Sequence, residues 1–336
     1  MINKKKINLS EKIFIAGGSG MVGSATYKVL IKNGYGSKEN NGIIMIPNRK
    51  DLNLLESNDV RKWFKLNRPT VVIMAAAKVG GILANTLEPY NFLSENLKLQ
   101  TNVIEAAFQY KVKRFLFLGS SCIYPKFAHQ PIKEESLLSG ELESTNEWYA
   151  IAKIAGIKLC QALRKQYDFD AISLMPTNLY GPNDNYDSTN SHVMAALIKK
   201  FLLAKRDGIP SVTCWGTGTP LREFMHVSDL AKAILFSLEY WCPDDIGAPK
   251  DKNGNPLNYL NVGTGKDISI KALAKKIAQA CKYEGEIIWD KNKPDGTPRK
   301  NLDISNMREI GWQSSIDLDK GINDTISDLL KTKKFL

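Results

Sequence analysis

A glycine-rich turn near the start of the chain constrains the fold more than any other feature. The stretch AGGSGMVG places Gly17, Gly20 and Gly23 three residues apart, between the apolar run 12–17 and a segment with helical spacing, 21–33. In such a turn the first glycine permits a tight bend, the second lets the backbone approach a pyrophosphate, and the third lets the helix pack closely. A glycine-rich turn is a weak signal alone, but between a strand and a helix it predicts a dinucleotide site.

The sequence alternates between short apolar runs and longer segments with helical spacing. The runs lack polar alternation, as expected for strands that are covered on both faces. After 12–17 they are 42–47, 70–77, 114–121, 170–182 and 257–263. The clearest helices between them are 92–110 and 146–167. This order predicts an α/β fold with a doubly wound parallel sheet of the Rossmann type, whose ligands bind at the carboxyl ends of the strands.

The pattern becomes less regular after Tyr180. Residues 183–225 carry loop signals, and 226–241 resemble the start of one more strand and a helix. In the tail, 266–336, we expect a helix (269–282), a strand (286–289) and a loop.

We therefore expect two domains, each assembled from two segments. The Rossmann domain would comprise 1–178 plus 226–264. A smaller α/β substrate domain toward the C-terminus would comprise 179–225 plus 265–336.

Composition limits the compartment and the partners that we expect for this chain. Of 336 residues, 43% are hydrophobic, and no apolar run approaches the ~20 residues that span a bilayer. Five cysteines without a C-x-x-C spacing indicate neither a disulfide framework nor a zinc site, which favours the reducing cytoplasm. The net charge of +11 allows a nucleic-acid, membrane or small-anion partner. Since no nucleic-acid-binding motif accompanies the charge, we expect neither nucleic acid nor a membrane as partner.

The residues after the second predicted strand indicate which nicotinamide binds. An acidic residue there holds the ribose 2′-hydroxyl of NAD, whereas a basic residue accepts the 2′-phosphate of NADP. This chain has Arg49 and Lys50 after IIMIP. We therefore expect NADP(H), with Arg49 as the better phosphate ligand because of its forked guanidinium.

Two side chains with the spacing for acid–base chemistry lie in the predicted helix 146–167. Tyr149 and Lys153 are four residues apart, so they face the same side of the helix. A free tyrosine titrates near pH ~10, and a neighbouring ammonium lowers that pKa. The same lysine can hold the cofactor ribose. Ser120, at the end of the fourth strand, can orient a carbonyl that Tyr149 protonates.

A resemblance to a known family extends over nearly the whole chain. The matching stretches are AGGSGMVGSA, RKDLNLL, AAAKVGGI, LGSSCIYPK, NEWYAIAKIAGIKLC, MPTNLYGPNDN, SHV, CWGTGTPLREFMHVSD and DGTPRK. The chain resembles the extended short-chain dehydrogenase/reductases and, more closely, the GDP-L-fucose synthase family. That family performs the 3,5-epimerisation and 4-reduction of GDP-4-keto-6-deoxy-D-mannose with NADPH. The family commonly has an arginine inside the glycine turn, where this chain has Ser19, so NADPH preference rests on Arg49 and Lys50.

The resemblance implies that Cys122 and His192 are the acid–base pair for epimerisation. A ketone at C4 acidifies the protons at C3 and C5, and inversion needs a base on one face and a proton donor on the other. A thiol and an imidazole, with ordinary pKa values near ~8.5 and ~6.5, can hold or give a proton near neutrality. Ser120 and Tyr149 would stabilise the enolate oxygen. Either member of the pair could be the base.

The resemblance also implies the residues that contact the cofactor and the substrate. The cofactor residues are Gly17, Gly18, Ser19, Gly20, Met21, Val22, Gly23, Arg49, Lys50, Asp51, Leu52, Asn53, Leu54, Ala75, Ala76, Leu118, Gly119, Ser120, Ser121, Tyr149, Lys153, Pro176, Thr177, Asn178, Leu179 and His192. The GDP-sugar residues are Lys200, Trp215, Arg222, Asp295 and Lys300. No metal ligands are implied.

The sequence leaves two alternative functions open, and it also predicts an oligomeric state. The chain could be a C4 reductase, with or without epimerisation, on another GDP-4-keto sugar such as a heptose. It could also be a catalytically silent NADP-binding protein, although the intact Ser120, Tyr149 and Lys153 argue against this. Helices 92–110 and 146–167 have more apolar positions than one core face needs, and we expect a homodimer.

Overall fold

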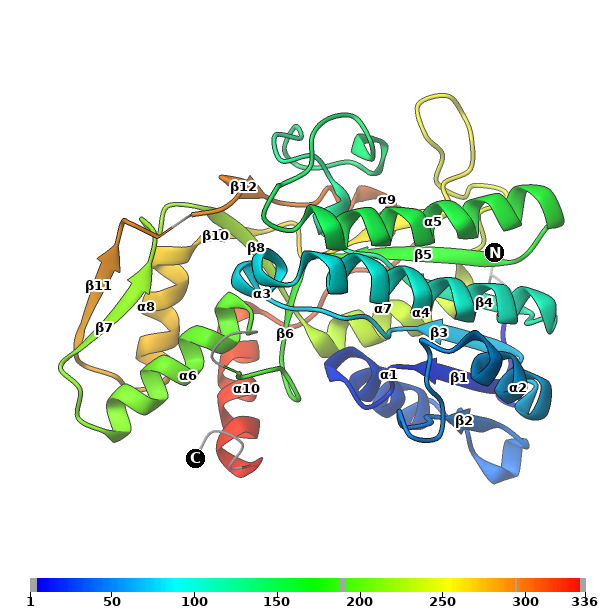
Figure 1. Ribbon diagram of the computed structural model, residues 1–336, viewed down its shortest axis with the longest axis horizontal. Helices are drawn as coiled ribbons and strands as arrows, with labels where there is room; N and C mark the ends of the chain where they lie inside the picture. The colour runs from blue at the N-terminus through cyan, green and yellow to red at the C-terminus, as the bar shows by residue number, and fades with distance from the viewer. Residues whose placement is uncertain (1–4, 188–190, 294, 333–336) are drawn as a thin grey trace.

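The centre of the molecule is a parallel sheet of six strands (Figure 1). The computed structural model describes residues 5–187, 191–293 and 295–332. In spatial order, the strands are β2 (Ile43–Met45), β1 (Lys12–Ala16), β3 (Val71–Met74), β4 (Arg114–Leu118), β5 (Ala171–Pro176) and β9 (Tyr259–Val262). All five neighbouring pairs are parallel. The predicted doubly wound α/β fold is thereby confirmed.

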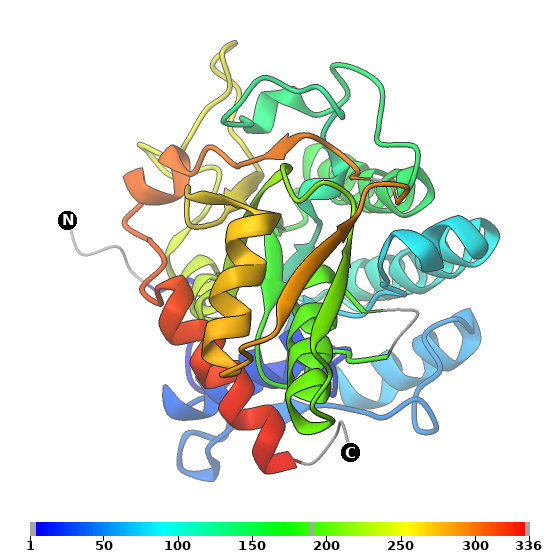
Figure 2. The same ribbon diagram turned by 90° about the vertical axis from the view of Figure 1, so that its left-hand side faces the viewer.

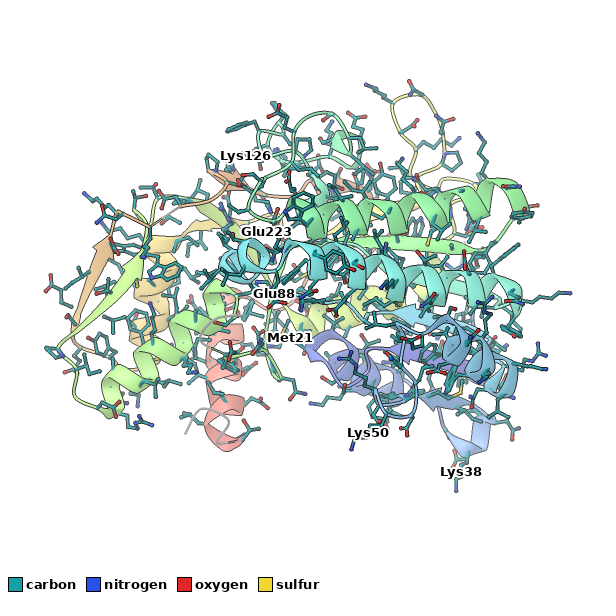
Figure 3. All side chains as sticks on the ribbon, in the orientation of Figure 1. Met21, Lys38, Lys50, Glu88, Lys126 and Glu223 are labelled. Atoms are coloured by element: carbon teal, nitrogen blue, oxygen red, sulfur yellow. The ribbon has the colours of Figure 1, made fainter. Side chains whose placement is uncertain are left out.

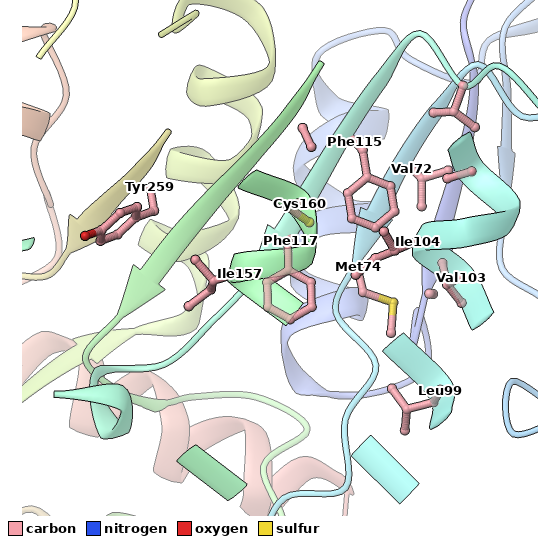
Figure 4. Close-up of a cluster of buried hydrophobic side chains, with 14 of the residues drawn as sticks. Val72, Met74, Leu99, Val103, Ile104, Phe115, Phe117, Ile157, Cys160 and Tyr259 are labelled. Atoms are coloured by element: carbon pink, nitrogen blue, oxygen red, sulfur yellow. The ribbon is translucent and has the colours of Figure 1, made fainter. Parts of the chain in front are cut away.

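Helices cover both faces of this sheet (Figure 1). One face packs against α2 (Ser57–Asn67), α4 (Pro89–Gln109) and α5 (Glu147–Tyr167), and the other packs against α1 (Met21–Lys32) and α7 (Val227–Tyr240). Phe115 and Phe117 of β4 point toward α4 and α5, as Figure 4 shows, whereas Leu116 between them joins the opposite core. Because every β4 residue is buried, the strand reads as one continuous apolar run.

The rest of the chain builds a second layered unit (Figure 2). Its strand β8 (Leu221–His226) pairs with β6 (Asn178–Tyr180), β10 (Asp267–Ser269) and β12 (Arg299–Lys300). A separate parallel pair is formed by β7 (Ser211–Trp215) and β11 (Glu286–Asp290). The helices packed around these strands are α6 (Val193–Arg206), α8 (Ile270–Ala280) and α10 (Leu318–Thr332). Short elements complete the chain: α3 (Ile82–Leu87), α9 (Ser305–Glu309) and the 3₁₀ turns η1 (Lys38–Asn40), η2 (Ser121–Ile123) and η3 (Glu134–Ser136).

Two sequence predictions about this second unit were wrong. The run 170–182 is not one strand, because the chain leaves the central sheet at Thr177, whose hydroxyl donates to the Glu223 carbonyl oxygen beside β6. The region 183–225 is not mainly loop, since it contains α6, β7 and most of β8. The loop signals at 183–187 and 216–220 obscured a helix between them that buries Met194, Ile198 and Phe201 at helical spacing.

The tail also contains a helix that the sequence reading missed. Helix α10 buries Ile322, Ile326 and Leu329 against the second unit. Upstream of it, Met307 and Trp312 return to the central sheet and join the core beneath α1 and α7. The last forty residues thus contribute to the cores of both units.

The strand order reverses direction at β1, which lies between β2 and β3. Chain connections leave opposite sides of the sheet at such a switch point, so the carboxyl ends of the strands are open to a ligand. The glycine turn after β1 lies at this edge.

Candidate active site

The glycine turn brings β1, α1 and β3 into backbone contact. Gly17 has a φ of +80°, and a Cβ at this position would lie 2.7 Å from the Ala76 Cα. A Cβ on Gly23 would lie 2.2 Å from the Gly17 carbonyl oxygen. Side chains at these two positions would therefore force apart the strand, the helix and the neighbouring strand.

The N-terminus of α1 has the features of an anion site. Its N-cap, Gly20, provides no side-chain hydrogen bond, and the first turn contains no acidic residue. A Cβ on Gly20 would meet only the Gly17 carbonyl oxygen, at 3.4 Å, so the space above the helix is open. Ser19 and Gly20 are exposed there. Amide groups and a helix dipole that no side chain offsets fit the pyrophosphate of a dinucleotide.

Two cations follow β2 at the same edge of the sheet. Arg49 and Lys50 are exposed, and within the described residues neither takes part in an ion pair. The turn that presents them is fixed by Asn48, whose side-chain oxygen accepts from the Lys50 backbone N–H at 2.8 Å. In Figure 3, Lys50 lies below Met21, which begins α1. The pair is therefore free to bind a phosphate.

The remaining predicted cofactor residues lie near the carboxyl ends of the strands. Ala75 and Ala76 follow β3, Leu118 ends β4, and Pro176 ends β5. The segment after β2 contains Asp51, Leu52, Asn53 and Leu54. Gly119 and Ser121 follow β4, Thr177 follows β5, and Asn178 and Leu179 are the first two residues of β6. The Asn178 side chain donates to the Glu223 carbonyl oxygen at 2.8 Å, so its amide helps to hold β6 beside β8.

Ser120, Tyr149 and Lys153 meet where β4 ends. The Ser120 hydroxyl oxygen accepts from the Cys122 backbone N–H at 3.2 Å, and it hydrogen-bonds with the Tyr149 phenol. Lys153 is 3% exposed, and its ammonium nitrogen Nζ donates to the Leu118 carbonyl oxygen at 2.8 Å. Nζ also lies 5.9 Å from the centre of the Tyr149 ring. The predicted trio is therefore assembled by the end of one strand and the first two turns of one helix.

The pKa values of this trio differ from the sequence expectation. Burial raises the pKa of Tyr149, the charge of Cys122 raises it further, and the hydrogen bond with Ser120 opposes the rise. Burial lowers the pKa of Lys153 to about 7. The sequence predicted that a charged lysine would lower the pKa of Tyr149. That prediction was wrong, because Lys153 is only partly charged near neutrality and the pKa of Tyr149 is raised.

Cys122 receives two nitrogen donors. Asn146 Nδ2 lies 3.3 Å from the Cys122 Sγ, and Lys300 Nζ lies 3.7 Å from it. The thiol sits in the turn η2 and is partly exposed. The charges of Cys122 and Tyr149 influence each other, as do those of Cys122 and Arg222. The sulfur is thus placed between the phenol and two cations.

His192 approaches the site from the second unit. It is the N-cap of α6, and its backbone oxygen accepts from the Ala196 N–H at 2.9 Å. The ring is exposed in surface area, yet enough protein surrounds it for desolvation to lower its pKa. The preceding residue lies against the loop after β3, since a Cβ on Gly81 would be 2.7 Å from the Ser191 carbonyl oxygen. No hydrogen bond joins His192 to Cys122 among the described residues.

Arg222 and Lys300 form the basic wall of the site. They are register partners in the parallel pair of β8 and β12. Burial lowers the pKa of Arg222, and the nearby charges of Cys122, Glu143 and Asp295 oppose this. In the part of the chain that is described, the guanidinium makes no ion pair within 4 Å, and one of its nitrogens donates to the Leu221 carbonyl oxygen. A partly desolvated cation without a paired carboxylate fits an anionic ligand.

The other predicted substrate residues lie farther out on the second unit. Trp215 is 49% exposed, with Lys293 Nζ 5.4 Å from its ring centre. Asp295 accepts from the Thr217 backbone N–H and hydroxyl at 2.7 and 2.8 Å, which ties its loop to the turn after β7. Lys200 donates to the Thr213 carbonyl oxygen at 3.0 Å. These contacts place the side chains on one exposed surface but do not bring them to Cys122.

The sequence reading missed two features beside the thiol. Asn146 stood in the quoted stretch NEWYAIAK, although it was not singled out. Glu143, which is 6% exposed, accepts from the Thr297 hydroxyl at 3.1 Å and pairs with Lys126 at 3.1 Å. It thereby fastens the loop before β12 to the loop before α5. Nothing in the sequence marks Glu143, because its role depends on a partner 154 residues away.

The comparisons with known proteins agree on one group. The sequence model described as "NAD dependent epimerase/dehydratase family" matches residues 13–247. A probable GDP-L-fucose synthase from Oryza sativa is 47% identical over 96% of this chain and 94% of its own length. The GDP-L-fucose synthase of Escherichia coli is 45% identical over 96% of this chain and 98% of its own.

A solved structure extends the comparison to a related activity. The GDP-mannoheptose C4 reductase of Campylobacter jejuni, with NADP bound, superimposes with a TM-score of 0.83 and 33% sequence identity. The match covers 96% of this chain and 99% of that chain. Within the described residues, no helix is long and apolar enough to cross a membrane, and no group of His, Cys, Asp and Glu side chains is arranged to hold a metal ion.

Proposed function

The chain belongs to the NAD dependent epimerase/dehydratase family, and within it we propose that it acts as a GDP-L-fucose synthase. It would convert GDP-4-keto-6-deoxy-D-mannose to GDP-L-fucose by inverting C3 and C5 and reducing C4 with NADPH. The observation that carries this proposal is the position of the Cys122 thiol. It lies beside Tyr149 after β4, at the same edge of the sheet as the glycine turn after β1. A reductase alone needs the phenol but not the thiol.

The chain's own residues account for cofactor binding. NADPH supplies the hydride that reduces C4. The open N-terminus of α1 would bind its pyrophosphate, and Arg49 and Lys50 would bind its 2′-phosphate. Lys153 would donate to the ribose from its buried position beside Leu118.

Epimerisation would use the thiol and the imidazole in turn. One of Cys122 and His192 takes the proton from C3, and later from C5, while the other returns a proton to the opposite face. After the first inversion the base holds the C3 proton and the acid has lost its own, so proton exchange with solvent water restores both groups before C5 is inverted. Ser120 and Tyr149 would donate hydrogen bonds to the enolate oxygen that forms at C4. In the reduction, the same Tyr149 O–H would give its proton to the C4 oxygen.

The basic wall would hold the substrate's diphosphate. Arg222 and Lys300 present two positive charges next to the thiol, so the sugar attached to the diphosphate would reach Cys122. The exposed face of Trp215 would take the nucleoside, with Lys200 and Asp295 on the same surface.

A second candidate is a C4 reductase for a GDP-4-keto-heptose. The match to the heptose reductase of Campylobacter jejuni favours it. The two substrates differ in the group at C5, which is a methyl in the 6-deoxyhexose and a two-carbon chain in the heptose. The two functions also differ in the need for proton exchange at C3 and C5.

One experiment separates the two candidates. Enzyme, NADPH and GDP-4-keto-6-deoxymannose are combined in deuterated water, and the product is examined by NMR. We expect GDP-L-fucose with deuterium at C3 and C5. Stoichiometric reduction without deuterium at either carbon would refute the epimerase assignment. Cys122→Ser should lose deuterium incorporation while retaining NADPH binding, and Cys242→Ser, which alters the other partly exposed thiol, serves as the control.

The assembly, compartment and domain division are also proposals. Tyr90 and Trp148, on neighbouring helices α4 and α5, are 73% and 37% exposed, which supports pairing of these helices in a homodimer. All five cysteines are free, which supports a reducing cytoplasm. We propose that 1–178 plus 226–264 bind NADP and that 179–225 plus 265–336 bind the GDP-sugar. A single species of monomer mass in light scattering would refute the dimer.

A further inference from the structure

Asn146 occupies a capping position but does not cap. It is the N-cap residue of α5, where an asparagine side chain normally accepts a hydrogen bond from an N–H of the first helical turn. No such bond is present. Its backbone is nevertheless fixed on both sides, because its N–H donates to the Glu143 carbonyl oxygen at 3.1 Å and its carbonyl oxygen accepts from the Ala150 N–H at 3.1 Å. The side chain therefore projects from a well-defined position and serves something other than the helix.

The side-chain amide is instead directed at the sulfur of Cys122. Asn146 Nδ2 lies 3.3 Å from the Cys122 Sγ, while the other end of the amide, Oδ1, is buried without a hydrogen-bond partner. If the amide were flipped, Oδ1 would accept a hydrogen bond from the Cys122 thiol, and Nδ2 would have no hydrogen-bond partner. In either orientation, the sulfur is the only partner of this amide among the described residues.

We propose that Asn146 is a positioning residue of the epimerisation step, which holds the Cys122 sulfur toward the sugar and stabilises its thiolate by donating from Nδ2. This inference rests on the proposed function. Lys300, on β12 beside β8, donates to the same sulfur at 3.7 Å. Its charge, however, is also available to the substrate's diphosphate. A neutral amide keeps its bond to the sulfur whether or not the diphosphate is bound. A neutral donor also favours the thiolate without preventing its reprotonation, as a proton-transfer group requires.

The reactivity of the thiol tests this role without depending on turnover. The full chain is treated with iodoacetamide from pH 6 to 10, and alkylation of Cys122 is measured by mass spectrometry of its peptide. In Asn146→Ala, we expect a rate about 3- to 10-fold lower at pH 7 and a rate profile shifted to higher pH. Asn146→Asp should shift the profile further, because a carboxylate opposes a thiolate. Ser144→Ala, an exposed change two residues earlier, should leave the profile unchanged.

The two orientations of the amide predict opposite results for the aspartate variant. If the amide accepted from the thiol, a carboxylate would preserve that bond, and Asn146→Asp would react like the wild type at neutral pH. That result, or an unchanged profile in Asn146→Ala, would overturn the proposal. Because Asn146 makes no capping bond, Asn146→Ala should melt close to the wild-type temperature, which can be checked by circular dichroism.

A second readout separates this inference from the proposed function. Oxidation of GDP-L-fucose by NADP⁺ begins at C4 and needs no proton transfer by the thiol in its first step. Asn146→Ala should slow deuterium incorporation at C3 and C5 severalfold, but it should spare this oxidation. Equal losses in both assays would indicate general damage and refute a specific role. If the wild type incorporates no deuterium while the alkylation profiles still respond, the proposed function fails and the amide–sulfur contact stands.

Discussion

Lys300 of β12 lies directly beside Arg222 of β8 in parallel register, and its ammonium reaches the sulfur of Cys122. Residues 178 positions apart are thereby joined into one site. In the proposed function, this pairing would place the positive charge for the diphosphate next to the group that exchanges protons with the sugar. Binding of the diphosphate would then position the reacting carbons.

Replacing Arg222 with lysine tests this arrangement. We expect the KM for the GDP-sugar to rise about 10- to 100-fold, because a lysine cannot reproduce a forked contact worth about 1.5–3 kcal/mol. Steady-state kinetics gives the KM, and fluorescence titration should show unchanged NADPH affinity. Arg61→Lys, which changes an exposed residue of α2, is the matched control. An unaltered KM in Arg222→Lys would show that the guanidinium does not contribute to substrate binding.

Two glycines of the cofactor turn should respond differently to an added methyl group. In Gly20→Ala, the Cβ meets only one atom, at 3.4 Å, so the fold should persist while the methyl obstructs the anion site. In Gly23→Ala, the Cβ would lie 2.2 Å from the Gly17 carbonyl oxygen, and we expect the protein to be strongly destabilised. Thermal melting and NADPH titration distinguish the two effects. Normal NADPH affinity in a folded Gly20→Ala protein would contradict the assigned cradle.

Arg49→Ala should change the choice of cofactor. Loss of a phosphate contact worth about 1.5–3 kcal/mol should raise the KM for NADPH about 10- to 100-fold and leave the KM for NADH nearly constant. Lys50→Ala should have a smaller effect, since a single ammonium makes no bidentate contact. The measurement is the ratio of kcat/KM for the two cofactors. A ratio that does not move in Arg49→Ala would exclude this side chain from 2′-phosphate binding.

Lys153→Met should be inactive but more stable than the wild type at low pH. The pKa of the lysine is about 7 in the folded protein, against 10.5 for the free side chain. Below pH 7 both folded and unfolded states carry the proton, so the folded state bears the full cost of burying an ammonium. Between pH 7 and 10.5 only the unfolded state stays protonated, and wild-type stability rises by up to about 1.4 kcal/mol per pH unit.

Urea denaturation at pH 6 and pH 9 measures this difference. The methionine variant should unfold at a higher urea concentration than the wild type at pH 6. The difference between the two unfolding midpoints should be smaller at pH 9. Lys158→Met, an exposed change on the same helix, should show no such pH dependence. A gap that is constant with pH would mean that Lys153 stays protonated across this range.

The sequence predicted the central sheet well because its strands are local, continuous apolar runs. The glycine turn and the Tyr149–Lys153 spacing are equally local, and the structure brings them together with Ser120 as expected. The second unit was harder to predict. Helix α6 follows a polar loop, and β6 and β12 have only three and two residues, too few to show a periodicity.

The contacts that complete the site could not be read from local patterns. The expected effect of Lys153 on Tyr149 assumed a charged lysine, but burial, which no spacing reveals, lowers the lysine's own pKa. The pairing of Lys300 with Arg222 and the clamp between Glu143 and Thr297 join segments that are distant in the sequence. Such pairs become visible only once the chain is folded.

Met307 and Trp312 pack beneath α1 and α7, and this has a consequence for how the protein is made. The core beneath α1 and α7, begun by the first strand, is not closed until more than nine tenths of the polypeptide has been synthesised. The early segments therefore expose part of this core for most of translation, which at 5–20 residues per second lasts about 15 to 60 seconds. Chaperones that shield exposed strands should accordingly engage the nascent chain over its whole synthesis, and a premature stop before residue 312 should leave a product that is cleared rather than one that folds as a free nucleotide-binding module.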